Sequence, residues 1–178
     1  MALLNRQDII AAFTRLGQLA SADGSTLRLV LVGGAAMVLG YDARQSTQDI
    51  GALYLPPPEA IVVRAWAKII AQENGWPEDW LNDGAKAYLM GVSEGPVLFE
   101  ARGIVVRQTT AEQLLGMKLC AWRDDVDIAD ASCLLSALIK SHTRAQVWQR
   151  VEPYLVPGRE LKAQLAYDDL WESLHGVP

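Results

Sequence analysis

Residues able to hold a phosphate and a metal ion occur together in the first third of the chain. Gly33 and Gly34 follow the apolar run 27–32, and Arg44, Thr47 and Asp49 come soon after them. Glycines between a strand and a helix let backbone N–H groups approach a phosphate closely. A carboxylate that opens the next strand supplies the hard oxygen ligand that magnesium prefers. The pattern predicts metal-dependent phosphoryl transfer, although two glycines alone are equally typical of close helix–strand packing.

The position two residues after Asp49 departs from a complete metal site. A second carboxylate there would lie on the same face of the strand as Asp49, but the residue is Gly51. Glu100, on a later predicted strand, is a candidate replacement ligand, and an exposed strand residue is its alternative interpretation. Gly51 leaves three explanations open: a weakened one-metal site, a homologue that binds without catalysis, or an engineered inactivation.

A second group of charged residues follows in the C-terminal half of the chain. Lys118 lies among apolar neighbours on a predicted helix, where a lysine must reach the surface or find an anionic partner. Arg123 and Asp127 have the spacing of a helical ion pair. We interpret Lys118 as functional, and together with Arg123 it is expected to line one wall of a cleft.

The two groups together resemble the AbiEii/AbiGii nucleotidyltransferase toxins, a group within the DNA polymerase β-like superfamily. The segment from Gly33 to Gly51 is similar to that group's pattern Gly-Gly-Ala…Arg-x-Ser/Thr-x-Asp-x-Asp, except at Gly51. The later segment is similar to its pattern Lys-x-x-Ala-x-Arg…Asp-x-x-Asp, with matching residues Lys118, Ala121, Arg123, Asp127 and Asp130. The resemblance extends over residues 27–140.

The resemblance implies a role for each matching residue. Asp49 would bind Mg²⁺, with Glu100 as the further ligand suggested above. Lys118 would contact the phosphates of the nucleotide, and Asp130, or alternatively Asp127, would orient Lys118 or the attacking hydroxyl. The nucleotide-binding residues would be Gly33, Gly34, Arg44, Thr47, Lys118 and Arg123.

The expected activity is transfer of a nucleotide from an NTP to an acceptor such as the tRNA 3′ end, with a cognate antitoxin protein as partner. Two alternatives remain: a non-catalytic homologue that binds a nucleotide or a partner, and a transferase acting on a small molecule or a protein hydroxyl. The net charge of −5 disfavours extended nucleic-acid binding. A tRNA end would need a local basic patch, for which the candidates are Arg102, Arg107, Lys118 and Arg123.

The elements that must position these residues predict an α/β fold. Apolar periodicity and capping residues predict helices at 5–20, 34–41, 59–74, 111–122, 126–140, 143–154 and 159–175, with a helical turn at 76–81. Strands are predicted at 27–32, 48–55, 87–90, 97–101 and 104–107, with the continuous apolar strand 27–32 at the centre. We expect a small mixed sheet with flanking helices in residues 1–110, polymerase β-like, and a helical segment in 111–178.

The bulk properties are those of an ordinary globular protein. The chain has 178 residues, of which 51% are hydrophobic and 21% charged. No apolar run reaches the ~18 residues of a membrane span. Arg6 and Asp8 interrupt any signal-peptide pattern, so a cytoplasmic protein is expected, with no membrane partner.

Overall fold

The chain forms two compact units in the computed structural model, which describes residues 3–123 and 125–175, the side chains of 87 and 88 excepted. The first, here called the sheet unit, comprises Met1–Ala87 and Glu94–Thr109. The second, the helical unit, comprises Tyr88–Ser93 and Thr110–Pro178. The backbone therefore passes from one unit to the other at three places.

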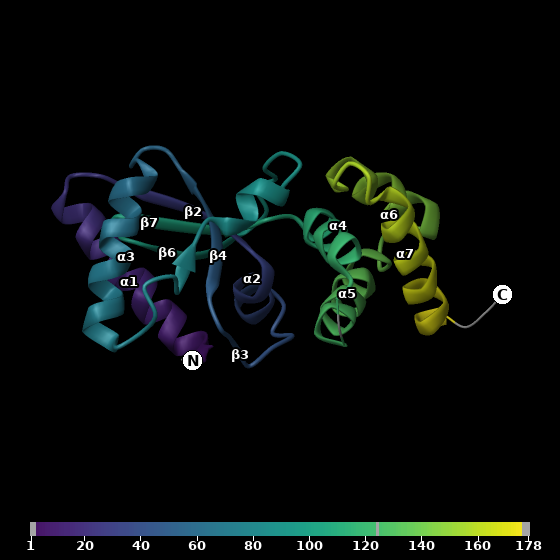
Figure 1. Cartoon of the computed structure of the whole chain (residues 1–178), viewed down its shortest axis with the longest axis horizontal. Coiled ribbons are helices and arrows are strands. Elements are labelled where there is room, and N and C mark those ends of the chain that lie inside the picture. Colours follow the sequence, from purple (N-terminus) through teal and green to yellow (C-terminus); the bar gives the residue numbers. More distant parts are fainter. Residues whose placement is uncertain (1–2, 124, 176–178) are drawn as a thin grey trace. The chain divides into compact units, whose positions relative to one another are not determined.

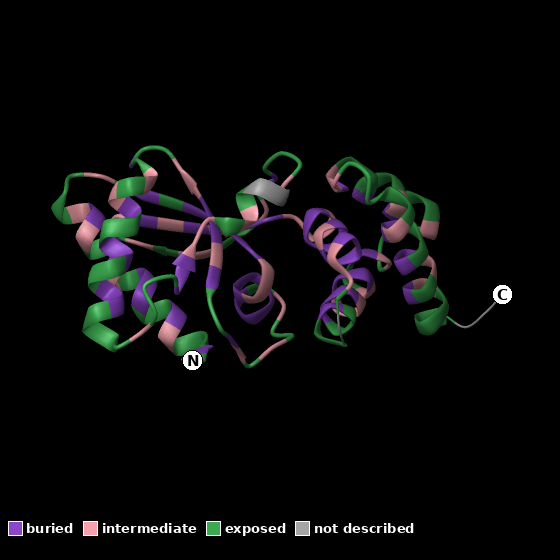
Figure 2. Ribbon diagram, viewed as in Figure 1, coloured by how far each residue is buried: buried purple, intermediate pink, exposed green. Residues whose placement is uncertain are grey.

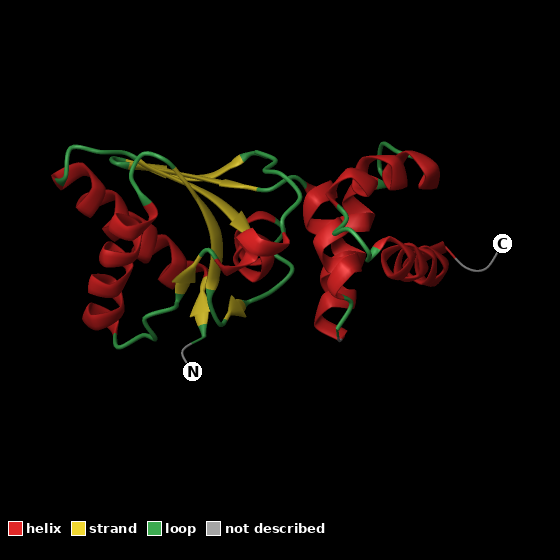
Figure 3. Ribbon diagram, turned by 45° about the horizontal axis from the view of Figure 1, so that its top comes forward, coloured by secondary structure: helices red, strands yellow, loops and turns green. Residues whose placement is uncertain are grey.

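The sheet unit contains a five-stranded mixed sheet in the order β5-β4-β2-β7-β6. The central strand β2 (Leu27–Val32) runs parallel to β7 (Ile104–Gln108) and antiparallel to β4 (Ile50–Leu55). The edges are β5 (Leu81–Asn82), parallel to β4, and β6 (Val97–Ala101), antiparallel to β7. A separate two-stranded sheet joins β1 (Leu4–Asn5) to β3 (Ser46–Thr47). The predicted α/β class, with a mixed sheet and β2 at its centre, is confirmed (Figure 3).

The α-helices in the described part of the sheet unit are α1 (Arg6–Ala22), α2 (Gly33–Gly40) and α3 (Ala60–Asn74). Helix α1 begins with a capping box between Asn5 and Asp8, which satisfies backbone donors of its first turn. It packs against β7 so closely that a Cβ on Gly17 would lie 2.7 Å from the Ile104 side chain. Helices α1 and α3 lie side by side (Figure 1).

The helical unit consists of α4 (Ala111–Ala121), α5 (Asp125–Leu138), α6 (Arg144–Val151) and α7 (Glu160–His175), with the 3₁₀ turn η2 (Glu152–Tyr154) after α6. Thr110 and Thr143 cap α4 and α6, as expected for threonine before a helix. Helix α4 packs against α5 and α7, and its leucines are buried. Figure 2 shows where buried residues lie along these helices. The described helices include none long and apolar enough to cross a bilayer.

Three predicted elements around the middle of the chain differ in the structure. Residues 84–88 form the 3₁₀ helix η1 (Gly84–Tyr88), where a strand at 87–90 was expected. The predicted helical turn 76–81 ends in β5, because Leu81 joins the sheet opposite Ile50. The predicted strand 48–55 begins only at Ile50, so Asp49 lies in the bend between β3 and β4.

Candidate phosphate-binding site

The start of α2 presents backbone donors next to open space. Gly33 has φ +62°, a left-handed conformation that glycine adopts without strain, and a Cβ added there would meet no atom within 4 Å. Val32 precedes the helix, and its apolar side chain cannot cap the first turn. The first N–H groups of a helix lack intrahelical partners, so this end favours an anion.

Gly34 brings three of the predicted residues together. A Cβ at Gly34 would overlap the Thr47 hydroxyl and would lie 3.1 Å from Thr47 Cβ and 3.5 Å from Arg44 Nη1. Thr47 is 6% exposed and donates its hydroxyl hydrogen to the backbone oxygen of Asp49, at 3.0 Å. The absent side chain of Gly34 thus lets the loop that carries Arg44, Thr47 and Asp49 reach the start of α2.

Asp49 presents an exposed carboxylate at this end of the sheet. Its Oδ2 accepts a 2.7 Å hydrogen bond from Asn82 Nδ2 on the neighbouring strand β5. In the sheet register, Gly51 faces Val32 on one side and Asn82 on the other. Gly33, Asp49, Gly51 and Asn82 therefore gather at one end of three adjacent strands.

Gly51 stands where the second carboxylate of a metal site would be. Its φ lies outside the left-handed region, and a Cβ added there would meet only Val32, at 3.2 Å from Cγ2 and 3.6 Å from the carbonyl oxygen. No group of three or more His, Cys, Asp or Glu side chains in residues 3–123 and 125–175 is arranged to hold a metal ion. A single carboxylate still fits Mg²⁺, which proteins commonly bind through one or two carboxylates together with substrate phosphates.

Glu100 does not join this site, so its predicted role as a metal ligand is wrong. Glu100 pairs with Val105 on β7, and Val105 pairs with Arg28 on β2. Arg28 in turn pairs with Leu55, at the far end of β4. Along β4, Leu55 is four residues from Gly51, a distance of about 13 Å in an extended strand. Across the sheet, β6 lies three strand spacings from β4, or about 14 Å. A ligand must lie within about 2–2.6 Å of its metal, so Glu100 and Asp49 cannot share one.

The expected basic patch does not form within the sheet unit. Arg102 lies in the turn between β6 and β7, at the opposite end of the sheet from Gly33. Arg107 donates to the Gly95 carbonyl at 3.0 Å and lies 3.6 Å from Glu94. Lys118 and Arg123 belong to the helical unit.

Lys118 lies inside the helical unit, where it joins α4 to α5. Its Nζ is 2.7 Å from Asp127 Oδ1 and 2.8 Å from Asp130 Oδ2, and all three residues are buried. Arg123 Nε donates to Asp127 Oδ2 at 2.8 Å, which is the ion pair that the sequence spacing suggested. An ammonium has three N–H donors, and the two carboxylates occupy two of them.

This cluster changes the protonation equilibrium of Asp127. Burial alone would raise the pKa of its carboxyl, but the hydrogen bonds from Arg123 and Lys118 outweigh burial and hold the pKa below its usual range. Asp127 is therefore a stable anion and an unsuitable proton acceptor near neutral pH. Asp127 and Asp130 both hold Lys118 in place through their ion pairs with its Nζ.

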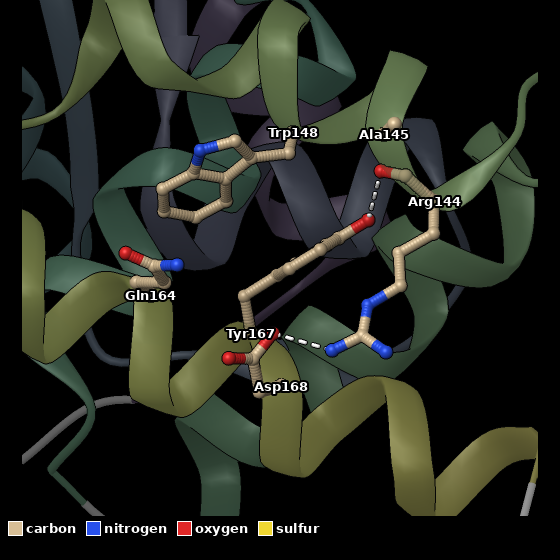
Figure 4. Close-up of a pocket in the computed structure, with 6 residues that line it drawn as sticks. All are labelled: Arg144, Ala145, Trp148, Gln164, Tyr167 and Asp168. Carbon is tan, nitrogen blue, oxygen red and sulfur yellow. Dashed lines mark hydrogen bonds and ion pairs between the residues drawn. The ribbon is translucent and has the colours of Figure 1, made fainter. Parts of the chain in front are cut away.

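A hollow of about 290 Å³ lies elsewhere in the helical unit, between α6 and α7 (Figure 4). Its walls are Trp148 and Tyr167, with rings 5.2 Å apart, and the side chains of Arg144, Ala145, Gln164 and Asp168. Arg144 pairs with Asp168 at 2.5 Å, and the Tyr167 hydroxyl donates to the Arg144 carbonyl at 2.8 Å. Because these polar groups already satisfy one another, we interpret the hollow as a packing feature of the two helices.

Asn82 is the site residue that the sequence did not reveal. A two-residue strand gives almost no periodic signal, and an asparagine after Trp80 and Leu81 is equally typical of a turn. The turn signal was present, but the pairing of Asn82 with Asp49 depends on strand order, which local patterns do not encode.

The four predicted residues Gly34, Arg44, Thr47 and Asp49 thus come together with Asn82 in the sheet unit, Glu100 lies toward the other end of the sheet, and Lys118 belongs to the helical unit. The chemistry of the site has to be inferred from these residues themselves. No protein-family model matches the chain, and neither a curated protein nor a solved structure matches it.

Proposed function

We propose that this chain is a magnesium-dependent nucleotidyltransferase that transfers a nucleotide from a nucleoside triphosphate to an acceptor hydroxyl. The observation that carries the proposal is the convergence of Arg44 and Thr47 on Gly34 at the start of α2, beside the exposed carboxylate of Asp49. A helix N-terminus and a guanidinium both favour an anion, and the carboxylate favours a cation. A triphosphate with its magnesium ion carries both charges.

The residues of the sheet unit divide the work of binding. Gly33, Gly34 and Arg44 would bind the phosphates, and Asp49 would hold Mg²⁺, which neutralises the triphosphate and makes the α-phosphorus more electrophilic. The acceptor oxygen forms a bond to the α-phosphorus. At the same time, the bond between the α-phosphorus and the oxygen that bridges it to the β-phosphate breaks. Pyrophosphate leaves, and the hydroxyl proton passes to solvent. The protein thus contributes position and charge neutralisation rather than a covalent intermediate.

We further propose the tRNA 3′ end as the acceptor and an antitoxin protein as the partner, as the sequence resemblance implies. The net charge of −5 supports an acceptor that is held over a small area, such as a single-stranded end. The two carboxylates paired with Lys118 take up two of its three N–H groups. The proposed contact between Lys118 and a phosphate would use the third. The activity proposed for the sheet unit does not depend on that contact.

A second candidate function, nucleotide binding without transfer, is favoured by the composition of the site. The two register positions beside Asp49 at the end of the sheet, Gly51 and Asn82, carry no carboxylate. A second carboxylate at position 51 would restore a two-acid site, and a Cβ there would require the Val32 side chain, with Cγ2 at 3.2 Å, to shift by a few tenths of an ångström. Gly51→Asp is therefore the variant that separates the two candidates, with Gly51→Asn as the control of equal size.

The test is a labelling assay with bulk tRNA, magnesium and each labelled nucleoside triphosphate in turn. The proposal expects label in tRNA with the unsubstituted chain, its loss in Asp49→Ala, and no change in Glu100→Ala, an acid remote from the site. Label with Gly51→Asp alone, absent with Gly51→Asn, would replace the proposal by the binding function. No label with any form would contradict transfer to tRNA.

A further inference from the structure

Asn82 holds its side-chain amide in one orientation. Its Oδ1 accepts a 3.1 Å hydrogen bond from the backbone N–H of Gly84, so Nδ2 is the atom that faces Asp49. The same Nδ2 also lies 3.3 Å from the backbone oxygen of Asp79. An amide whose oxygen and nitrogen both have partners of the matching kind is not free to flip.

The segment before Asn82 is fixed to the rest of the sheet unit. Trp80 is 1% exposed, and its Nε1 donates to the Ala67 carbonyl on α3 at 2.9 Å. The Trp80 carbonyl in turn accepts from the backbone N–H of Ile50 at 2.6 Å. Ile50 follows Asp49 directly. The backbone hydrogen bond between Ile50 and Trp80 therefore joins the two segments close to the Asp49–Asn82 hydrogen bond.

The residues around Asp49 add little unpaired negative charge. Asp83, the next residue along the chain, accepts hydrogen bonds from Arg64 Nη2 at 2.8 and 2.9 Å, so its charge is paired. Position 51 carries no side chain, and position 82 carries a neutral amide. One carboxylate binds a free divalent ion weakly, since Mg²⁺ gives up its water reluctantly and needs several oxygen ligands.

We infer that Asn82 is a positioning residue that holds Asp49 by Oδ2, leaves Oδ1 for a cation, and makes the site accept Mg²⁺ only as a complex with the nucleotide. The inference rests on the proposed function, because it assumes a triphosphate at the start of α2. The phosphates supply the oxygen ligands that Gly51 and Asn82 do not. The free ion, which lacks them, is not retained.

The experiment measures Mn²⁺ binding, as a spectroscopic substitute for Mg²⁺, by electron paramagnetic resonance with and without ATP, GTP, CTP or UTP. The unsubstituted chain is expected to retain Mn²⁺ only when a nucleotide is present. Asn82→Asp places a second carboxylate beside Asp49 and should bind free Mn²⁺ at least tenfold more tightly than the unsubstituted chain. Gln48→Glu adds the same charge next to Asp49 without that hydrogen bond, and it is the matched control.

Two further variants keep the test independent of folding defects. Gly51→Asp adds a carboxylate on β4, the strand that pairs with β5 at Asn82, and should also confer binding of free Mn²⁺. Asn82→Ala removes the positioning amide without adding charge, so it should weaken binding of the Mn²⁺–nucleotide complex several-fold and gain no affinity for the free ion. If Asn82 had only a structural role, the Asn82→Asp variant would show no gain of metal binding.

The outcomes separate the inference from the proposed function. Tight binding of free Mn²⁺ by the unsubstituted chain, or a gain in Asn82→Asp no larger than in Gln48→Glu, overturns the inference while nucleotide binding still stands. Failure of every nucleotide to bind, with or without Mn²⁺, overturns both.

Discussion

Gly33 and Gly34 are adjacent but have different physical requirements. Gly33 needs backbone freedom, since its φ is +62° and the space around it is open. Gly34 needs the absence of a side chain, since a Cβ there would overlap the Thr47 hydroxyl. The sequence presents both as the same letter, and only the structure distinguishes conformation from close approach.

This difference predicts different effects of the same substitution. Gly33→Ala should lower the free energy of unfolding by about 1–2 kcal/mol, the usual cost of a left-handed non-glycine residue. Gly34→Ala should cost about 1–3 kcal/mol as overpacking and should also weaken nucleotide binding, because it displaces Thr47 and Arg44. Urea unfolding and nucleotide titration of both variants make the comparison. Unchanged nucleotide affinity in Gly34→Ala would argue against the site.

At the scale of elements, the contact between α4 and α5 depends on a buried charge cluster. Lys118→Met leaves Asp127 and Asp130 without the cation that lies between them, and breaking a buried ion pair in this way costs about 3–5 kcal/mol. We expect the unfolding transition of the helical unit to fall accordingly. Arg123→Gln, at a side chain that is 71% exposed, should cost clearly less. A Lys118→Met, Asp130→Asn double variant that recovers nothing would contradict the charge argument.

The same cluster predicts how the helical unit responds to acid. Folding lowers the pKa of Asp127, so the stability from this group is complete above its unfolded pKa, about 3.9, and is lost as the pH falls below it. Urea unfolding at about pH 5 and about pH 3 should show this loss, and Asp127→Asn should reduce it. An equal loss in the variant would assign the acid sensitivity to other carboxylates.

Local patterns were sufficient for most of the elements. The strands 27–32 and 97–101 have the predicted ends, because apolar runs are short-range signals. The order and direction of the strands are long-range properties, and the predictions for Glu100 and Arg102 fail because of them. Glu100 and Arg102 lie near Arg107 in sequence, yet an antiparallel hairpin carries both toward the end of the sheet remote from Asp49.

At the scale of the whole molecule, the charge of −5 limits how an acceptor is held. A protein with two or fewer phosphate contacts loses roughly tenfold in affinity or less when salt rises about fourfold, whereas extended binders lose far more. A short hairpin that ends in the tRNA 3′ sequence should therefore be labelled about as well as full tRNA, with weak salt dependence. Strong salt dependence, or a hairpin that is not labelled, would indicate contacts beyond the 3′ end.

The three passages of the backbone between the units have a consequence for fragments of this protein. Ser93, in the short segment 88–93, donates from its backbone N–H and its hydroxyl to Gln113 Oε1, which lies on α4 and is buried. A break in the exposed turn after Arg102 would therefore give two fragments that each contain part of both units. Neither fragment alone would have a complete core, so the pair is suited to complementation, in which recovery of fold reports that two separately made halves have met.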